Sequence, residues 1–169
     1  MTLVARDVDV EVRAGTIADV PLLLSFIHAM AAFENLTVSA TEESLAASLF
    51  GERPAAHTLL AFVSGNPIGY VTYFFTFGTM VGKRGLWLDD LFIDPDFRGK
   101  GIGQALMAYL ADIAVQNQCA RFEWMVLDWN EPAIGFYRRL GASFLDDCRI
   151  CRLDEPHIAR VASSLTTNM

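Results

Sequence analysis

A glycine-rich loop, Arg98-Gly-Lys-Gly-Ile-Gly103, constrains the fold of this chain more than any other feature. Residues 86–93, directly before it, form an almost continuous apolar run, which predicts a strand. After it, apolar residues recur at the spacing of one helix face from Ala105 to Ala114. Alternate glycines let backbone N–H groups converge, and the dipole of the following helix adds positive charge. The sequence therefore predicts an anion site, such as a pyrophosphate cradle, between this strand and this helix.

The loop matches neither of two common phosphate-binding motifs. It lacks the Gly-Lys-Ser/Thr ending of a Walker A loop, and no N-terminal βαβ unit contains it, as a Rossmann fingerprint requires. An ordinary turn would also accept three glycines. The choice between a turn and an anion site therefore depends on motifs elsewhere in the chain.

The rest of the chain alternates between strand and helix patterns. Strands are predicted at residues 8–12, 58–63, 68–77, 121–127 and 143–153, and helices at 16–31, 41–51, 130–141 and 156–165. No linker or repeat divides residues 1–169, so we expect a single domain of the α/β (α+β) class. Its sheet is expected to be mixed and mostly antiparallel, with helices on both faces.

Charge and composition limit the classes of partner. The chain has 13 Lys and Arg against 20 Asp and Glu, a formal charge of −7, and 53% of its residues are apolar. We therefore expect no nucleic-acid partner and favour a cationic or neutral small substrate.

The longest apolar stretch, residues 20–33, is interrupted and too short to span a bilayer, and no signal peptide opens the chain. We expect a cytoplasmic protein without a membrane partner. Its cysteines lack zinc-ligand spacing, so no metal is expected.

Asp89 and Asp90 interrupt the apolar run before the loop. Burying an unpaired charge costs several kcal/mol, so a strand buried on both faces accepts two carboxylates only for a reason. They could cap the end of the strand or pair with Arg84.

A second motif, Asp128-Trp-Asn-Glu-Pro-Ala-Ile-Gly-Phe-Tyr-Arg-Arg-Leu-Gly141, follows the glycine loop. Together the two motifs resemble the GNAT acetyltransferases, and more closely their diamine branch, of the spermidine/spermine acetyltransferase type. The likeness extends to Ala32-Phe-Glu34, residues 50–54, residues 73–77 and Leu88-Asp-Asp-Leu-Phe92, and it covers nearly the whole chain. It implies the GNAT fold and acetyl-CoA as co-substrate. It also implies a homodimer, which is usual in this family.

The resemblance also implies roles for individual residues. The backbone of Leu91, Phe92 and Ile93 would receive the acetyl group and the pantetheine arm, which Asn130, Pro132 and Ala133 would flank. The CoA pyrophosphate would be held by Arg98, Gly99, Lys100, Gly101, Ile102, Gly103 and Gln104. The acceptor amine would be bordered by Phe33, Glu34, Asp89, Glu123, Trp124 and Met125. Tyr137 would stand near the thioester sulfur as general acid.

The chemistry of acyl transfer agrees with these roles. An alkyl amine is mostly an ammonium at neutral pH, since the reference pKa of lysine is about 10.4. Asp89 could bind that cation and accept its proton, directly or through a water, and Tyr137 could protonate the leaving thiolate. Backbone N–H groups of an irregular strand could polarise the thioester carbonyl. The amine would then attack directly in a ternary complex. In a simpler alternative, Tyr137 is only a packed helix residue and Glu34 only a solvated surface charge.

The chain departs from the diamine pattern at two places. Asp89 stands where that branch has Glu, and Cys148 stands where a Trp is expected. The acidic residues Glu34, Asp89, Asp146 and Asp147 nevertheless favour a small cationic acceptor, which would be a diamine, a polyamine or a lysine-like amino acid. Open alternatives are a protein or peptide α-amine, an antibiotic, and a non-catalytic module that binds acyl-CoA.

Overall fold

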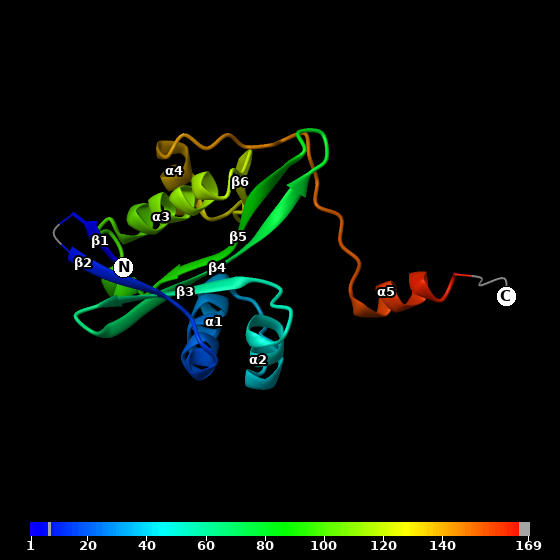
Figure 1. Ribbon diagram of the computed structural model, residues 1–169, viewed down its shortest axis with the longest axis horizontal. Coiled ribbons are helices and arrows are strands. Elements are labelled where there is room, and N and C mark those ends of the chain that lie inside the picture. Colours follow the sequence, from blue (N-terminus) through cyan, green and yellow to red (C-terminus); the bar gives the residue numbers. More distant parts are fainter. Residues whose placement is uncertain (7, 166–169) are drawn as a thin grey trace. The chain divides into compact units, whose positions relative to one another are not determined.

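The computed structural model describes residues 1–6 and 8–165 (Figure 1). The chain forms two compact units, Met1–Met125 and Val126–Met169. The first unit contains the sheet and the glycine loop, and the second contains the motif that begins at Asp128. The two units are described separately below.

The first unit is built on a sheet of six strands that follow one another in chain order. The strands are β1 (Thr2–Ala5), β2 (Val8–Ala14), β3 (His57–Val63), β4 (Asn66–Gly78), β5 (Lys83–Ile93) and β6 (Arg121–Trp124). Neighbouring strands from β1 to β5 are antiparallel, and β6 is parallel to β5. The prediction of a mixed, mostly antiparallel sheet is confirmed, with β1 as an additional strand.

Helices cover both faces of this sheet, as predicted. The helices α1 (Val20–Glu34) and α2 (Glu42–Phe50) lie on one face and α3 (Ile102–Gln116) on the other, while η1 (Ile17–Asp19) and η2 (Pro95–Phe97) are short 3₁₀ turns (Figure 1). Two side chains of α1, Leu23 and Phe26, are buried in a core cluster with Leu60, Tyr70 and Phe92 of the sheet. By length and composition alone Ile17–Glu34 could cross a membrane, which is weak evidence because core helices pass the same test.

The second unit contains α4 (Glu131–Arg139) and α5 (Glu155–Ala162). The Asn130 side chain caps α4 by accepting a hydrogen bond from the Ala133 N–H at 3.3 Å, as its position in the motif predicts. The prediction of a strand at residues 143–153 is wrong, because the described segment has no strand there and its side chains are exposed. A strand requires a neighbour that completes its hydrogen bonds, and no described strand pairs with this segment. β6 likewise ends at Trp124, before the predicted end of that strand.

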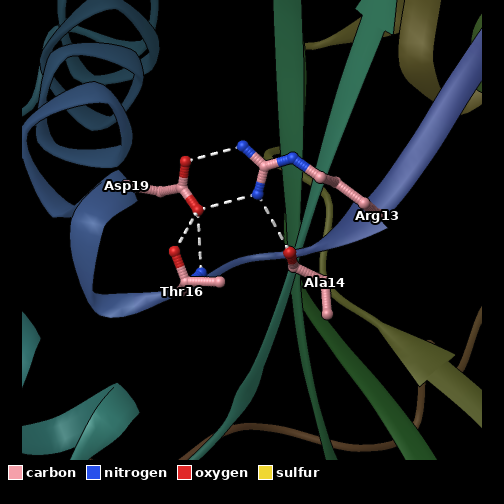
Figure 2. A network of polar contacts seen from close by, with 4 residues as sticks. All are labelled: Arg13, Ala14, Thr16 and Asp19. Atoms are coloured by element: carbon pink, nitrogen blue, oxygen red, sulfur yellow. Dashed lines mark hydrogen bonds and ion pairs between the residues drawn. The ribbon is translucent and has the colours of Figure 1, made fainter.

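A network of polar contacts joins β2 to the start of α1 (Figure 2). The Arg13 guanidinium donates two hydrogen bonds to the Asp19 carboxylate, at 2.8 and 2.7 Å. The backbone N–H and the hydroxyl of Thr16 both donate to the same carboxylate at 2.8 Å. These bonds, led by the one from Arg13, hold the pKa of Asp19 well below its usual range.

We expect Asp19→Asn to lower the free energy of unfolding by about 1 to 2 kcal/mol at pH 7, a modest loss because water screens the half-exposed Arg13. Since folding lowers the pKa of Asp19, its contribution is complete above the unfolded-state value of about 3.9 and declines as the pH falls below it. Urea unfolding at several pH values measures this. Asp112→Asn, on the exposed face of α3, is the control. Equal stability of Asp19→Asn and wild type at pH 7 would contradict the expectation.

Candidate functional site

A β-bulge in β5 stands at the centre of the candidate site. In the register with β4, Thr72 pairs with Asp90 and the next residue, Tyr73, pairs with Leu88. Asp89 is left between them without a partner on β4. One extra residue on one strand defines a β-bulge, which leaves backbone polar groups unpaired and bends the strand.

The bulge reverses which face of the sheet the side chains of β5 occupy. Tyr70 pairs with Phe92, and both lie in the core cluster with α1. Asp90 is two residues from Phe92 and therefore faces α1 as well, whereas Leu88 pairs with Tyr73 on the opposite face. The apolar run can therefore be buried on both sides of the bulge, with the two aspartates at the point of reversal. This explains why an otherwise buried strand contains Asp89 and Asp90.

The part of β5 beyond the bulge has an open edge. β6 pairs with β5 only up to the pair Leu88–Trp124. Residues 91–93 pair with β4 on one side, and among the described residues no strand pairs with their other side. The backbone groups of residues 91–93 that point to that side can therefore bind an extended, amide-containing chain in the manner of an added strand, beside the Ile93 carbonyl that accepts from the Arg98 Nε.

The charges of three carboxyl groups interact beside the bulge. Asp90 accepts a hydrogen bond from the Tyr70 hydroxyl at 3.1 Å. Burial raises the pKa of Asp90 to about 6, with help from the charges of Asp89 and Glu34 and against the effect of the Tyr70 hydrogen bond. Burial also raises the pKa of Glu34, at the end of α1. Asp89, Asp90 and Glu34 are called the acidic cluster below.

The acidic cluster has no cationic partner among the described side chains. The ion pairs of residues 1–6 and 8–165 join Arg13 to Asp19, Arg121 to Glu123 and His157 to Asp154. Arg84, one expected partner of the aspartates, has its guanidinium over the ring of Phe75 at 5.5 Å. A small ammonium ion would supply the missing positive charge. In the same described residues, no group of His, Cys, Asp and Glu is arranged to hold a metal ion.

The glycine loop presents uncapped backbone groups. Gly99 and Gly101 have φ values of +76° and +83°, in the left-handed region that favours glycine. Gly101 is the N-cap of α3 and has no side chain to bind the first-turn N–H groups, whereas Thr41 and Asn130 cap α2 and α4. The Arg6 guanidinium, in the turn between β1 and β2, donates to the Gly99 carbonyl at 3.1 Å. The loop is thus held in a form that can receive an anion.

The two basic side chains of the loop contact protein groups. The Arg98 Nε donates to the Ile93 carbonyl at 2.9 Å, and the guanidinium lies over the rings of Phe33 at 4.8 Å and Phe92 at 5.8 Å. The Lys100 Nζ donates to the Asp96 carbonyl at 3.0 Å. Arg98 therefore joins the loop to the end of α1, where Phe33 precedes Glu34 of the acidic cluster.

We expect Gly101→Ala to weaken binding of acetyl-CoA, the co-substrate that the resemblance implies, about tenfold, because a left-handed alanine costs about 1–2 kcal/mol and the loop would relax away from its binding form. Its Cβ would also meet the Arg6 Cγ at 3.1 Å. The matched control is Gly65→Ala, in the turn between β3 and β4, which has a similar φ of +78° and no atom within 4 Å. Calorimetric titration with acetyl-CoA compares the two. Equal affinity for both variants would argue against a role of the loop in binding.

The remaining predicted site residues lie in two places. Glu123 is in β6 and forms an ion pair with Arg121 at 2.7 Å, Trp124 follows it in β6, and Met125 is exposed just after the strand. The second unit holds a separate group on α4: Asn130, Pro132 and Ala133 at its start and the half-buried Tyr137 within it. The ring of Tyr137 lies 5.2 Å from that of Phe136.

Two residues at the acidic cluster have no role that the sequence alone predicts. From the sequence alone, Asp90 has no function separate from that of Asp89, and Tyr70 is only part of a predicted strand. Asp90 could have been singled out because it is a second carboxylate within an otherwise apolar strand. Nothing local to Tyr70 predicts its contact with Asp90, because the two residues meet only through the pairing of β4 with β5.

Comparison with known proteins gives the following similarities. The family model described as the acetyltransferase (GNAT) family matches residues 27–142. The thialysine N-epsilon-acetyltransferase of Sus scrofa is 35% identical over 146 residues, which are 80% of this chain and 85% of that protein. The L-ornithine N5-acetyltransferase of Arabidopsis thaliana is 31% identical over 84% of this chain and 83% of its own length. A solved integron cassette protein from V. cholerae has a TM-score of 0.77 and 28% identity, covering 92% of this chain and 98% of that one.

Proposed function

Because the chain belongs to the acetyltransferase (GNAT) family, we propose that it moves an acetyl group from acetyl-CoA to the primary amine of a small cationic acceptor. The acceptor class comprises diamines, polyamines and lysine-like amino acids. The observation that carries this proposal is the acidic cluster of Glu34, Asp89 and Asp90, which has no cationic partner among the described residues. The names of the thialysine and ornithine acetyltransferases support the same class, since both substrates are cationic amines.

In the proposed reaction the acceptor enters as an ammonium ion, and Asp89 removes one proton from it, directly or through a water. The neutral amine attacks the carbonyl carbon of the thioester, so that a C–N bond forms. N–H groups at the bulge of β5 stabilise the negative charge that develops on the carbonyl oxygen. The nitrogen loses its second proton as the amide forms.

Collapse of this intermediate breaks the C–S bond, and the sulfur leaves with the bonding electron pair. Tyr137 donates its proton to the thiolate and is reprotonated afterwards. Of the two protons that the nitrogen loses, one balances the proton delivered to sulfur and the other passes to solvent. The products are the N-acetylated amine and CoA, and no covalent enzyme intermediate forms.

Three features support the binding of acetyl-CoA. The open edge at residues 91–93 suits the amides of a pantetheine arm. The uncapped start of α3, with Gly99 and Gly101, suits a pyrophosphate. The capped start of α4, at Asn130, gives the second unit a rigid element that carries Tyr137.

The deciding experiment is a panel of amines incubated with purified protein and acetyl-CoA, with release of the CoA thiol as the readout. The panel contains spermidine, spermine, putrescine, lysine, thialysine, ornithine, an aminoglycoside and a short peptide. Release with an aliphatic di- or polyamine or an amino acid, well above the background without acceptor, is the expected result. Release only with the peptide or the aminoglycoside would reject the acceptor class. Background with every amine, despite measurable acetyl-CoA binding, would favour a binding module.

A homodimer is part of the same proposal. The second unit exposes several large apolar side chains to water, and such side chains often mark an interface with another protein. They are Phe144, Leu145, Ile150, Leu153, Ile158 and Val161. A second copy of the chain would bury them. Light scattering should then give twice the mass of one chain, and a monomer mass at micromolar concentration would reject the dimer. The cytoplasmic location stays a prediction.

A further inference from the structure

Tyr70 places its hydroxyl group in the hydrophobic core, where an apolar side chain would fill the same space. The side chain is 0% exposed and belongs to the core cluster beneath α1. Its ring is stacked on Phe26, with 6.1 Å between centroids, and lies 6.3 Å from Phe92. A buried hydroxyl costs free energy unless it finds a partner, so its presence in a cluster of rings requires an explanation.

The partner of this hydroxyl belongs to the acidic cluster. The Tyr70 hydroxyl donates to the Asp90 Oδ2 at 3.1 Å and also lies 3.6 Å from the Met30 sulfur of α1. The phenol stays protonated, because burial and the charge of Asp90 raise the pKa of Tyr70 far above its ordinary value. Tyr70 is therefore a permanent donor, packed against the rings of Phe26 and Phe92 and directed at one carboxylate oxygen.

We propose that Tyr70 is a positioning residue for the acceptor site: its hydroxyl holds the Asp90 carboxylate in place and in its ionised form, so that the acceptor ammonium meets a fixed negative charge beside Asp89. This proposal rests on the proposed function and deepens it. Tyr70 itself contacts neither substrate and acts through Asp90.

The groups that face Asp90 come from three elements. Asp89 lies beside it on β5, the charge of Glu34 acts on it from the end of α1, and the Tyr70 hydroxyl donates to it from β4. Burial and the two neighbouring carboxylates all oppose a negative charge on Asp90, and the Tyr70 hydrogen bond favours that charge. Loss of the hydroxyl would therefore raise the pKa of Asp90 from its value of about 6.

The test compares the pH dependence of kcat/KM for the best amine of the panel in wild type, Tyr70→Phe and Asp90→Asn. Wild-type activity should fall below about pH 6, where Asp90 takes up a proton. Tyr70→Phe should move this fall upward by about one pH unit, chiefly through KM for the amine. Asp90→Asn should abolish the fall at that pH. Tyr73→Phe removes a hydroxyl from another buried tyrosine of β4, on the opposite face, and should retain the wild-type profile.

A second readout needs no turnover. Carbon-13 NMR of the labelled aspartate carboxyls follows the titration of Asp90, identified by its absence in Asp90→Asn. The proposal expects this titration to move upward in Tyr70→Phe and to stay in place in Tyr73→Phe. Circular dichroism confirms that the variants are folded.

The outcomes separate this proposal from the proposed function. If the pH profile of kcat/KM for Tyr70→Phe coincides with that of the wild type, the positioning role is overturned, and the hydroxyl contributes only to the packing of the core. A fall near pH 6 that persists in Asp90→Asn would overturn it too, because another group would then set the profile. If the wild type acetylates no amine, the proposed function fails. The NMR titration then tests by itself whether Tyr70 controls the pKa of Asp90. The same Asp90 titration in wild type and Tyr70→Phe would reject the positioning role.

Discussion

Tyr137→Phe should lower kcat by about 10²- to 10⁴-fold, the usual contribution of a general acid, while acetyl-CoA binds with nearly wild-type affinity. The substitution removes one oxygen and keeps the ring. It therefore preserves the packing of α4, where the Tyr137 ring lies 5.2 Å from that of Phe136. Without the hydroxyl, the thiolate must leave unprotonated or take its proton from water, and the barrier for breaking the C–S bond rises. Calorimetric titration gives the affinity, and steady-state rates at saturating substrates give kcat.

Tyr109→Phe is the matched control, since it removes the same oxygen from a half-buried tyrosine in the middle of α3. It should leave kcat and the acetyl-CoA affinity unchanged. Turnover of Tyr137→Phe at the wild-type rate would remove Tyr137 from the mechanism. Equal losses in both variants would indicate a general effect on folding.

Asp89→Asn should lose most activity at low pH. The variant lacks the carboxylate that is proposed to remove a proton from the acceptor, so it depends on acceptor that is already neutral. The neutral fraction of an alkyl amine with a pKa of about 10.4 falls tenfold for each pH unit below that value. We therefore expect kcat/KM of the variant to rise about tenfold per unit between about pH 6.5 and 8.5, where the wild type changes little. At the lower end the deficit should reach about 10²- to 10⁴-fold.

The control is again Asp112→Asn, which removes one exposed carboxylate from α3 and should keep the wild-type profile. A small loss in Asp89→Asn that is the same at every pH would show that Asp89 positions the acceptor without taking its proton. Measuring kcat/KM of Asp89→Asn with a less basic acceptor amine provides a further check. Such an amine is more neutral at the same pH, so its deficit in the variant should shrink.

The elements that define the fold could be predicted because their signals are local. Gly99 and Gly101 stand between β5 and α3, Gly103 lies in the first turn of α3, and Asn130 and Pro132 mark the start of α4. The alternation of strand and helix patterns predicted the mixed, mostly antiparallel sheet, and the resemblance implied the GNAT fold. These features depend on neighbouring residues, so a linear reading recovers them.

The features that escaped prediction depend on contacts between distant segments. The bulge at Asp89 exists only through the register of β5 against β4, and the two aspartates that interrupt the apolar run do not by themselves show that the strand reverses its faces there. The contact of Arg98 with Phe33 likewise joins the loop to α1 across many residues of chain. The predicted strand at residues 143–153 failed for the same reason, since alternating apolar residues supply only half of a ladder.

The bulge also makes the chain unequally tolerant of different kinds of genetic change. A substitution at Asp89 alters one side chain. A single-codon deletion there would restore regular alternation along β5 and exchange the inner and outer faces of every residue on one side of it, either Asp90 and Phe92 or Leu86 and Leu88. A substitution at this position therefore keeps the register of β5, whereas a change in the length of the strand there shifts the register of a whole segment.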